Sequence, residues 1–256
     1  MQWNIQWTAM RQSKRFCYQI AASIGALVLV AAGNALSQEA GRDGTAAAVT
    51  APEAHNYARW ESAIAAFEKA DRANPPPKGA VLFVGASTIT LWKSLEADFP
   101  EHKVINRGFG GSEIVDSTHF ADRIIFPYEP KMIFLRSGSN EIFNGESPEQ
   151  VSADFEAFVK KVREKLPDAP IVYISINPIP SRWGQNDKNL KANELIRAAI
   201  GKMPKVKFLD IWDISITADG KPREDLFGPD RLHFNAAGYK LLAERVRPLL
   251  PPAQTK

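Results

Sequence analysis

Cysteine is almost absent from this chain of 256 residues: the single cysteine, Cys17, lies in an N-terminal segment that we expect to be removed. A mature chain without thiols excludes disulfide bridges, zinc sites with cysteine ligands and a cysteine nucleophile. It also suits an oxidising compartment. Any covalent chemistry must therefore use another nucleophile.

An excess of charge of one sign is also missing. The formal net charge is +3, but Arg11, Lys14 and Arg15 lie in a stretch without any Asp or Glu, and without them basic and acidic residues balance at 29 each. Nucleic-acid binding depends on clustered Lys and Arg that neutralise phosphates. We therefore expect no nucleic-acid partner.

The N-terminus has the pattern of an export signal over residues 1–37. The three basic residues precede a nearly continuous apolar run over 20–32, and Ala35 and Ser37 form a small-residue cleavage site before Gln38. We expect a periplasmic or secreted protein with no stable membrane insertion after cleavage. An uncleaved N-terminal anchor is the alternative, because the apolar run approaches the length of a membrane span.

The remaining chain divides into a flexible linker, a domain and a short tail. Residues 38–54 are rich in Ala, Gly and Thr without apolar periodicity, which is typical of a linker. We expect one domain over 55–250 and a tail over 251–256. No fixed-period repeat is present.

Helical patterns and short apolar runs alternate along the domain. Helices are indicated by apolar spacings of three and four from Tyr57 to the stop at Asn74, over 151–166, over 190–200 and over 239–246. Buried strands are expected over 81–84, 104–106, 132–135, 171–176 and 206–211. This alternation predicts a three-layer, doubly wound α/β fold with a five-stranded parallel sheet of the flavodoxin type, in which ligands bind beyond the carboxyl ends of the strands.

Polar residues and glycines follow three of these strands. Ser87 comes directly after the first strand, where its hydroxyl could act as a nucleophile or cap a helix. Gly110 and Gly111 follow the second strand, in a loop able to present backbone N–H groups or simply to turn. Asn140 follows the third strand, with a side-chain amide that could stabilise an oxyanion or its own turn.

An Asp-x-x-His motif lies near the C-terminus. Asp230 could fold back on His233 and hold one imidazole tautomer, which leaves the other ring nitrogen free as a base; the alternative is a solvated loop pair. Single motifs of this kind are weak evidence. Their order along the chain, each beyond a strand or on the last loop, favours one shared site.

In this order the motifs resemble the blocks of the SGNH hydrolases, also called GDSL-type esterases. Four segments of this chain are similar to the family's blocks: Val84–Ser87, Asn106–Gly111, Gly138–Glu141 and Asp230–His233. The resemblance spans roughly residues 57–248. It looks closest to the exported bacterial branch, whose members carry sequence strings similar to those at Leu91-Trp92, Asn106–Gly111 and Leu232–Tyr239. Two positions depart from the family pattern: Ala86 and Glu141 stand where the family has Asp.

The resemblance implies the fold already expected and a serine esterase that cleaves short acyl or acetyl esters through an acyl-enzyme. Ser87 would be the nucleophile, His233 the general base and acid, and Asp230 its orienting carboxylate. The N–H groups of Ser87 and Gly111 and the Asn140 amide would form the oxyanion hole, with Gly110 as the rival of Gly111. The partner would be a small-molecule or glycan ester.

Substrate contacts are the least defined part of the sequence. Arg182 and Trp183, in the loop after the fourth strand, and Gly110 are candidates, although the loop could equally be a rigid proline-braced connection. We expect no cofactor and no metal site, because His55, His102 and His119 lack ligand-type spacing and are interpreted as surface residues.

Two other functions fit parts of the pattern. One is a catalytically silent domain of the same fold that binds acylated envelope glycans. Ala86 and Glu141 favour it mildly, and the intact Ser87, Asp230 and His233 argue against it. The other is a phosphate-binding domain that uses Gly110, Gly111 and Ser112. Labelling by a fluorophosphonate separates the first from an esterase, and a thermal shift with nucleotides but no esterase activity would support the second.

Overall fold

A computed structural model describes residues 55–252 of the chain. The predicted signal segment, the linker and most of the predicted tail lie outside these residues, so the domain boundaries stay predictions. No helix in the described part is long and apolar enough to cross a membrane.

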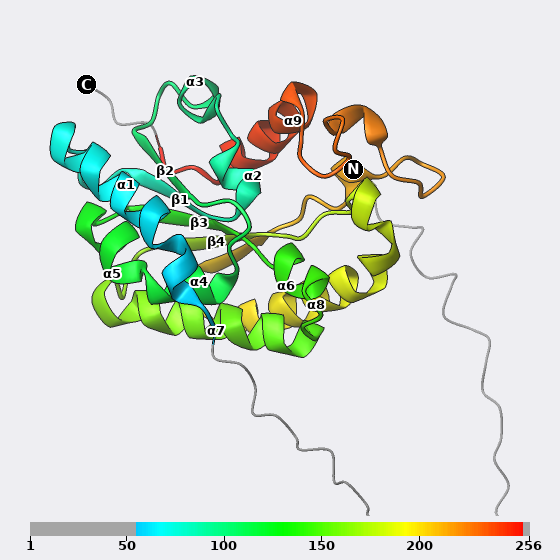
Figure 1. Cartoon of the computed structure of the whole chain (residues 1–256), viewed down its shortest axis with the longest axis horizontal. Helices are drawn as coiled ribbons and strands as arrows, with labels where there is room; N and C mark the ends of the chain where they lie inside the picture. The colour runs from blue at the N-terminus through cyan, green and yellow to red at the C-terminus, as the bar shows by residue number, and fades with distance from the viewer. Residues whose placement is uncertain (1–54, 253–256) are drawn as a thin grey trace, which may run out of the picture. The chain divides into compact units, whose positions relative to one another are not determined.

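Five strands and nine α-helices make up the described part, with 3₁₀ turns between them (Figure 1). The strands are β1 (Val81–Gly85), β2 (Val104–Gly108), β3 (Met132–Arg136), β4 (Ile171–Ile174) and β5 (Val206–Leu209). The helices are α1 (Glu61–Ala73), α2 (Ser87–Thr90), α3 (Leu95–Asp98), α4 (Ile114–His119), α5 (Ala121–Ile124), α6 (Ser139–Phe143), α7 (Pro148–Lys165), α8 (Asn186–Ile200) and α9 (Ala236–Val246). The 3₁₀ turns are η1 (Tyr57–Trp60), η2 (Phe126–Tyr128), η3 (Pro180–Gln185), η4 (Asp213–Ser215), η5 (Glu224–Leu226) and η6 (Arg247–Leu249).

The sheet is parallel throughout, with strand order β2-β1-β3-β4-β5. The chain adds β2 on one side of β1 and then crosses to the other side for β3. This reversal is the switch point of a doubly wound fold, and the crevice beyond the carboxyl ends of β1 and β3 is where such folds bind ligands. The predicted fold class is confirmed.

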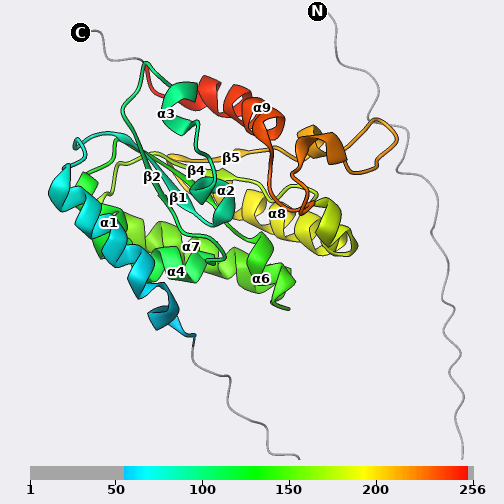
Figure 2. The ribbon, with the colours of Figure 1, turned by 45° about the horizontal axis from the view of Figure 1, so that its top comes forward.

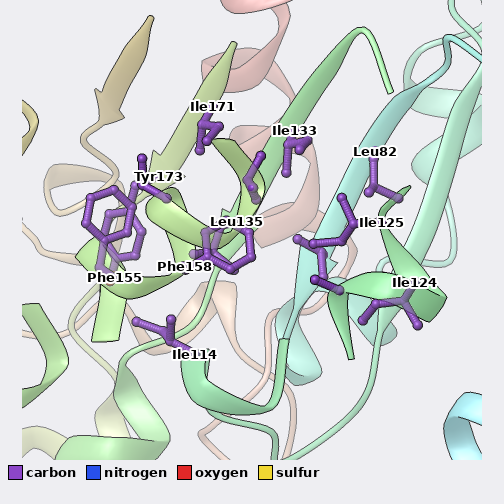
Figure 3. Close-up of a cluster of buried hydrophobic side chains, with 14 of the residues drawn as sticks. Leu82, Ile114, Ile124, Ile125, Ile133, Leu135, Phe155, Phe158, Ile171 and Tyr173 are labelled. Carbon is purple, nitrogen blue, oxygen red and sulfur yellow. The ribbon is translucent and has the colours of Figure 1, made fainter. Parts of the chain in front are cut away.

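Helices cover both faces of the sheet because alternate strand residues point to opposite sides. On one face, strand residues such as Leu82 and Leu135 pack against α1, α4, α5, α7 and α8 in the larger core, part of which Figure 3 shows. On the other face, Phe83 and Phe134 stack at a centroid distance of 4.7 Å and pack with Trp92 and the apolar side of α9. Figure 2 shows α3 and α9 on one side of the sheet and α1, α4 and α7 on the other.

Strands β4 and β5 end earlier than predicted. The pattern indicated strands to Ile176 and Ile211, but β4 ends at Ile174 and β5 at Leu209. The side-chain amide of Asn193 on α8 takes over both backbone groups of Ile176, at 2.9 and 2.7 Å, and Ser175 Oγ accepts the N–H of Ile211 at 2.9 Å. Side chains thus replace the sheet ladder at these ends, which an apolar run in the sequence does not reveal.

Candidate active site

Ser87 lies at the carboxyl end of β1 because the strand turns sharply at Gly85. Gly85 has φ +135°, and an added Cβ would lie 2.2 Å from the backbone oxygen of Arg136 on neighbouring β3. Only glycine fits this close approach. The turn makes Ser87 the first residue of α2 and directs the chain over the sheet edge.

His233 joins Ser87 to Asp230 through a continuous line of hydrogen bonds. His233 Nε2 lies 3.0 Å from Ser87 Oγ, and His233 Nδ1 lies 2.6 Å from Asp230 Oδ2. A carboxylate can only accept, so Nδ1 carries the proton and Nε2 of the neutral ring is free to accept the hydroxyl proton of Ser87. The structure therefore brings together the three residues that the sequence analysis grouped from opposite ends of the domain.

The carboxylate of Asp230 is held by its own loop. Its Oδ1 accepts the backbone N–H groups of Leu232 and His233, at 3.0 and 3.1 Å. These backbone bonds, followed by the bond from the imidazole, lower the pKa of Asp230 to about 2. The group is thus ionised wherever a serine hydrolase works, and its position does not depend on the imidazole alone.

The glycine loop after β2 lies against Ser87. A Cβ added to Gly110 would be 3.9 Å from Ser87 Cβ, and Gly111 has φ +83°. Asn106 ties the strand end to α2, because its amide donates to the Ile89 carbonyl at 2.6 Å while its Oδ1 accepts the Gly108 N–H at 2.9 Å. Within residues 55–252, neither Gly110 nor Gly111 uses its backbone N–H in a hydrogen bond, so both donors remain available to a ligand.

Asn140 reaches the same crevice from α6, after β3. Its Nδ2 donates to the Ser112 carbonyl at 2.9 Å, and its Oδ1 accepts from Arg182 Nη1 at 3.0 Å. The second Nδ2 hydrogen remains unused within the described residues. Asn140 thereby offers one N–H to a group bound beside Ser87.

Glu141, at a position where the family pattern has Asp, links the third block to the start of α4. Its two carboxylate oxygens accept the N–H groups of Ile114, at 2.7 Å, and Gly138, at 2.9 Å. The side chain is fully buried, and burial raises the pKa of Glu141 to about 8 against the lowering effect of these backbone donors. The Glu141 side chain therefore joins the start of α4 to the turn at Gly138.

A cavity of about 350 Å³ opens beside Ser87. It is lined by Ser87, Thr90, Leu91, Gly110, Gly111, Asn140, Arg182, Leu232 and His233. Gly110 and Arg182, both predicted substrate contacts, are among its walls. Trp183 is not, and 39% of its surface is exposed, so its predicted substrate contact stays a prediction. Two larger cavities, of about 420 and 370 Å³, contain neither Ser87 nor His233.

Two histidines differ from the surface role that the sequence suggested. The side chain of His102 is only 5% exposed. His55 places Nε2 2.7 Å from Asp116 and Nδ1 3.6 Å from Glu113. Although these three residues bring ligand atoms within 4.8 Å of one another, the two ring nitrogens face different carboxylates. The His55 ring thus lies between two carboxylates and forms a hydrogen bond with Asp116.

Comparison with known proteins identifies the family of the chain. Residues 84–241 match the GDSL-like lipase/acylhydrolase family. The chain is 31% identical over 209 residues to platelet-activating factor acetylhydrolase IB subunit alpha1 of Bos taurus, covering 75% of this chain and 82% of the relative. It is 29% identical over 183 residues to subunit alpha2 of that protein in Rattus norvegicus, covering 66% and 75%.

Solved structures share the fold. A GDSL-like lipase from Bacteroides thetaiotaomicron superposes with a TM-score of 0.60 at 16% identity, over 76% of this chain and 96% of the other. An acetyl-xylooligosaccharide esterase from Geobacillus gives 0.55 at 14% identity, over 70% and 99%. The described domain thus has the three-layer α/β fold of the SGNH hydrolases. The chain belongs to the GDSL-like lipase/acylhydrolase family and is a hydrolase of ester bonds. Its place in the exported bacterial branch stays a prediction.

Proposed function

We propose that the protein is a serine esterase that hydrolyses short acyl esters, acetyl esters among them, through an acyl-enzyme on Ser87. The observation that carries this proposal is the line Asp230–His233–Ser87, with distances of 2.6 and 3.0 Å. A serine is a weak nucleophile until an adjacent base can take its proton, and this arrangement supplies that base.

The reaction would run in two halves. Ser87 Oγ attacks the ester carbonyl carbon while its proton passes to His233 Nε2; the bond to the alcohol then breaks, and the alcohol leaves with that proton. Water attacks the acyl-enzyme with His233 again as base, and Ser87 regains its proton as the acid is released. Asp230, ionised through its low pKa, stabilises the imidazolium in both halves.

The negative oxygen of each tetrahedral intermediate would be bound by three N–H donors. These are the backbone N–H of Ser87, the backbone N–H of Gly111 and the free Nδ2 hydrogen of Asn140, all from residues that line the cavity. Loss of one such donor typically lowers kcat by about 10²- to 10³-fold. We expect that loss for Asn140→Ala, with a smaller change in KM, measured on a p-nitrophenyl ester.

Short acyl groups suit the size and chemistry of the cavity. Its volume of about 350 Å³ is at the lower end for ligand sites. Leu91 and Leu232 offer apolar surface for the acyl or alcohol group. The names of two similar proteins refer to the hydrolysis of acetyl groups: a platelet-activating factor acetylhydrolase and an acetyl-xylooligosaccharide esterase. These names support acetyl esters as substrates.

The test compares acyl chain lengths and the nucleophile. We expect p-nitrophenyl acetate and butyrate to be turned over faster than the octanoate, and Ser87→Ala to abolish turnover. Ser94→Ala, at an exposed serine that bonds Asp98 instead, is the matched control. A fluorophosphonate should label wild type at Ser87, as located by mass spectrometry. Activity that survives Ser87→Ala would refute the proposal, and absence of both labelling and turnover would leave the silent glycan-binding domain as the better description.

We further propose that the chain is exported and cleaved before Gln38. The support is the basic and apolar pattern of residues 1–37. Fractionation of bacteria that express the full chain should yield a periplasmic or secreted form whose N-terminal residue is Gln38. Recovery of an uncleaved chain with the membranes would favour the anchor instead.

A further inference from the structure

The amide of Asn140 has only one orientation that satisfies its neighbours. A carbonyl oxygen, that of Ser112, faces one end of the amide at 2.9 Å, and a guanidinium nitrogen of Arg182 faces the other at 3.0 Å. The carbonyl can only accept and the guanidinium can only donate. The oxygen of Asn140 must therefore point to Arg182 and its nitrogen to Ser112, which leaves the second N–H for a ligand.

Arg182 reaches Asn140 as part of a wider attachment to α6. The same Nη1 lies 3.1 Å from the backbone oxygen of Ser139 and 3.3 Å from its Oγ. The guanidinium also stacks on the ring of Phe143, one helical turn beyond Asn140, at 4.2 Å from the ring centroid. Phe143 is 55% exposed, and its ring is a further contact that restrains the guanidinium.

Arg182 has no carboxylate within ion-pair distance in the described residues, and the carboxyl group of Glu141 acts on its charge only from farther away. Arg182 forms none of the ion pairs found at 4.0 Å or less between residues 55 and 252. Its positive charge thus acts on the amide oxygen of Asn140. A cation at the oxygen end of an amide polarises it and makes its N–H groups stronger donors.

The turn that carries Arg182 also touches the loop of the base. The backbone N–H of Ser181 donates to the carbonyl of Arg231 at 2.9 Å, and Arg231 lies between Asp230 and His233. Turn η3 therefore connects the Asn140 side of the cavity with the His233 side. Sequence separation hides this link, because Arg182 lies 42 residues after Asn140.

We propose that Arg182 is a positioning residue of the esterase, which holds the Asn140 amide in its donor orientation and strengthens the N–H that binds the oxyanion. The inference rests on the proposed function. Without Arg182, Ser112 alone would restrain Asn140, and the amide could swing about its side-chain torsion. A donor misplaced by about 1 Å can cost about 10²-fold in rate, so Arg182 acts on kcat through Asn140 and not on ground-state binding.

A double-mutant cycle on p-nitrophenyl acetate tests the link. We expect Arg182→Ala to lower kcat by about 10- to 100-fold with less than about a threefold change in KM. In the Asn140→Ala background the same change should lower kcat by less than about threefold, because the group through which Arg182 acts is gone. Arg182→Lys, which keeps the charge but not the fork of donors, should recover part of the loss.

Arg197→Ala is the matched control. Arg197 also stacks on a phenylalanine, with its guanidinium carbon 4.1 Å from the centroid of the Phe208 ring. It lines the cavity of about 420 Å³, which does not contain Ser87. It should keep the wild-type kcat. Equal losses from Arg182→Ala in both backgrounds, or a loss confined to KM, would overturn the inference and leave Arg182 a substrate contact or a purely structural residue. If a thermal melt shows that Arg182→Ala is not folded, the same double-mutant cycle with Arg182→Lys tests whether Arg182 acts through Asn140.

The failure of the proposed function would look different. Wild type would then be no faster than Ser87→Ala, and both proposals would fall together. An active wild type with an additive cycle rejects only the role of Arg182.

Discussion

Replacing Asp230 by Asn tests whether the tautomer of His233 is set by its carboxylate. In the structure, Oδ1 of Asp230 accepts two backbone N–H groups and Oδ2 accepts the imidazole proton. An asparagine must keep its oxygen towards the two backbone donors, because its NH₂ group would face them donor to donor. The NH₂ group then points at His233 Nδ1 and donates to it.

This reversal moves the imidazole proton to Nε2. A protonated Nε2 cannot accept the hydroxyl proton of Ser87, so the base is lost although every atom is nearly in place. The loss of the correct tautomer typically costs about 10⁴-fold in kcat, or about 5 kcal/mol of transition-state stabilisation. We expect a decrease of about 10³- to 10⁴-fold for Asp230→Asn.

The assay is the steady-state hydrolysis of p-nitrophenyl acetate at neutral pH, together with a thermal melt. The melting temperature should change little, because the two backbone bonds of residue 230 survive the substitution. Asp213→Asn, at an aspartate that pairs with Arg245 at 2.6 Å, is the control and should keep the wild-type rate. A kcat of Asp230→Asn within tenfold of wild type would refute the reasoning about the tautomer.

Two further predictions concern stability. Gly108→Ala should destabilise the fold by about 3 kcal/mol, since the new Cβ would lie 2.3 Å from the backbone nitrogen of Thr90. Urea unfolding measures this change. Gly184→Ala is the control and should be neutral, because no atom lies within 4 Å of its added Cβ; equal stability of the two variants would contradict the packing. Burial, followed by the nearby carboxylates of Asp154 and Glu113, raises the pKa of Glu146 from its ordinary 4.5 to about 7. The folded state therefore holds a proton that the unfolded chain has released, so stability should fall as pH rises from about 4.5 to about 7. Solvent access limits the contribution of Glu146 to about 1 kcal/mol, or about 2–4 °C in Tm. Glu146→Gln should make the fall shallower, while the part due to the raised pKa of Glu141 remains. An unchanged slope in Glu146→Gln would contradict the assignment.

The longer elements of the fold could be predicted because their signals are local. The buried runs of β1 and β3 and the apolar stripes of α7 and α9 are found where the sequence pattern placed them. Helices of four to six residues, such as α2 and α6, have too few turns to show a period. The ends of β4 and β5 depend on side chains from elsewhere in the fold, so the pattern overextended both strands.

The site was predictable only as a set of separate residues. The convergence of Ser87 and His233, 146 residues apart, follows from the sheet topology and from the family resemblance, and not from either motif alone. Nothing near Arg182 indicates that it faces Asn140. The contacts of half-buried His55 with Asp116 and Glu113 were missed for the same reason, because both carboxylates follow it by about sixty residues.

The contact between Trp60 and Gly111 defines where a functional fragment has to start. A Cβ at Gly111 would lie 3.2 Å from the Trp60 ring, so the turn before α1 forms a wall behind a loop with a proposed oxyanion donor. The family match begins only at residue 84. A shortened protein cut to that boundary would lose most of β1, which lies between β2 and β3 in the sheet, and α1. A cut placed just before β1 would keep the sheet, Ser87, Asp230 and His233 yet lose the support behind Gly111, so truncations meant to preserve activity should begin no later than Tyr57.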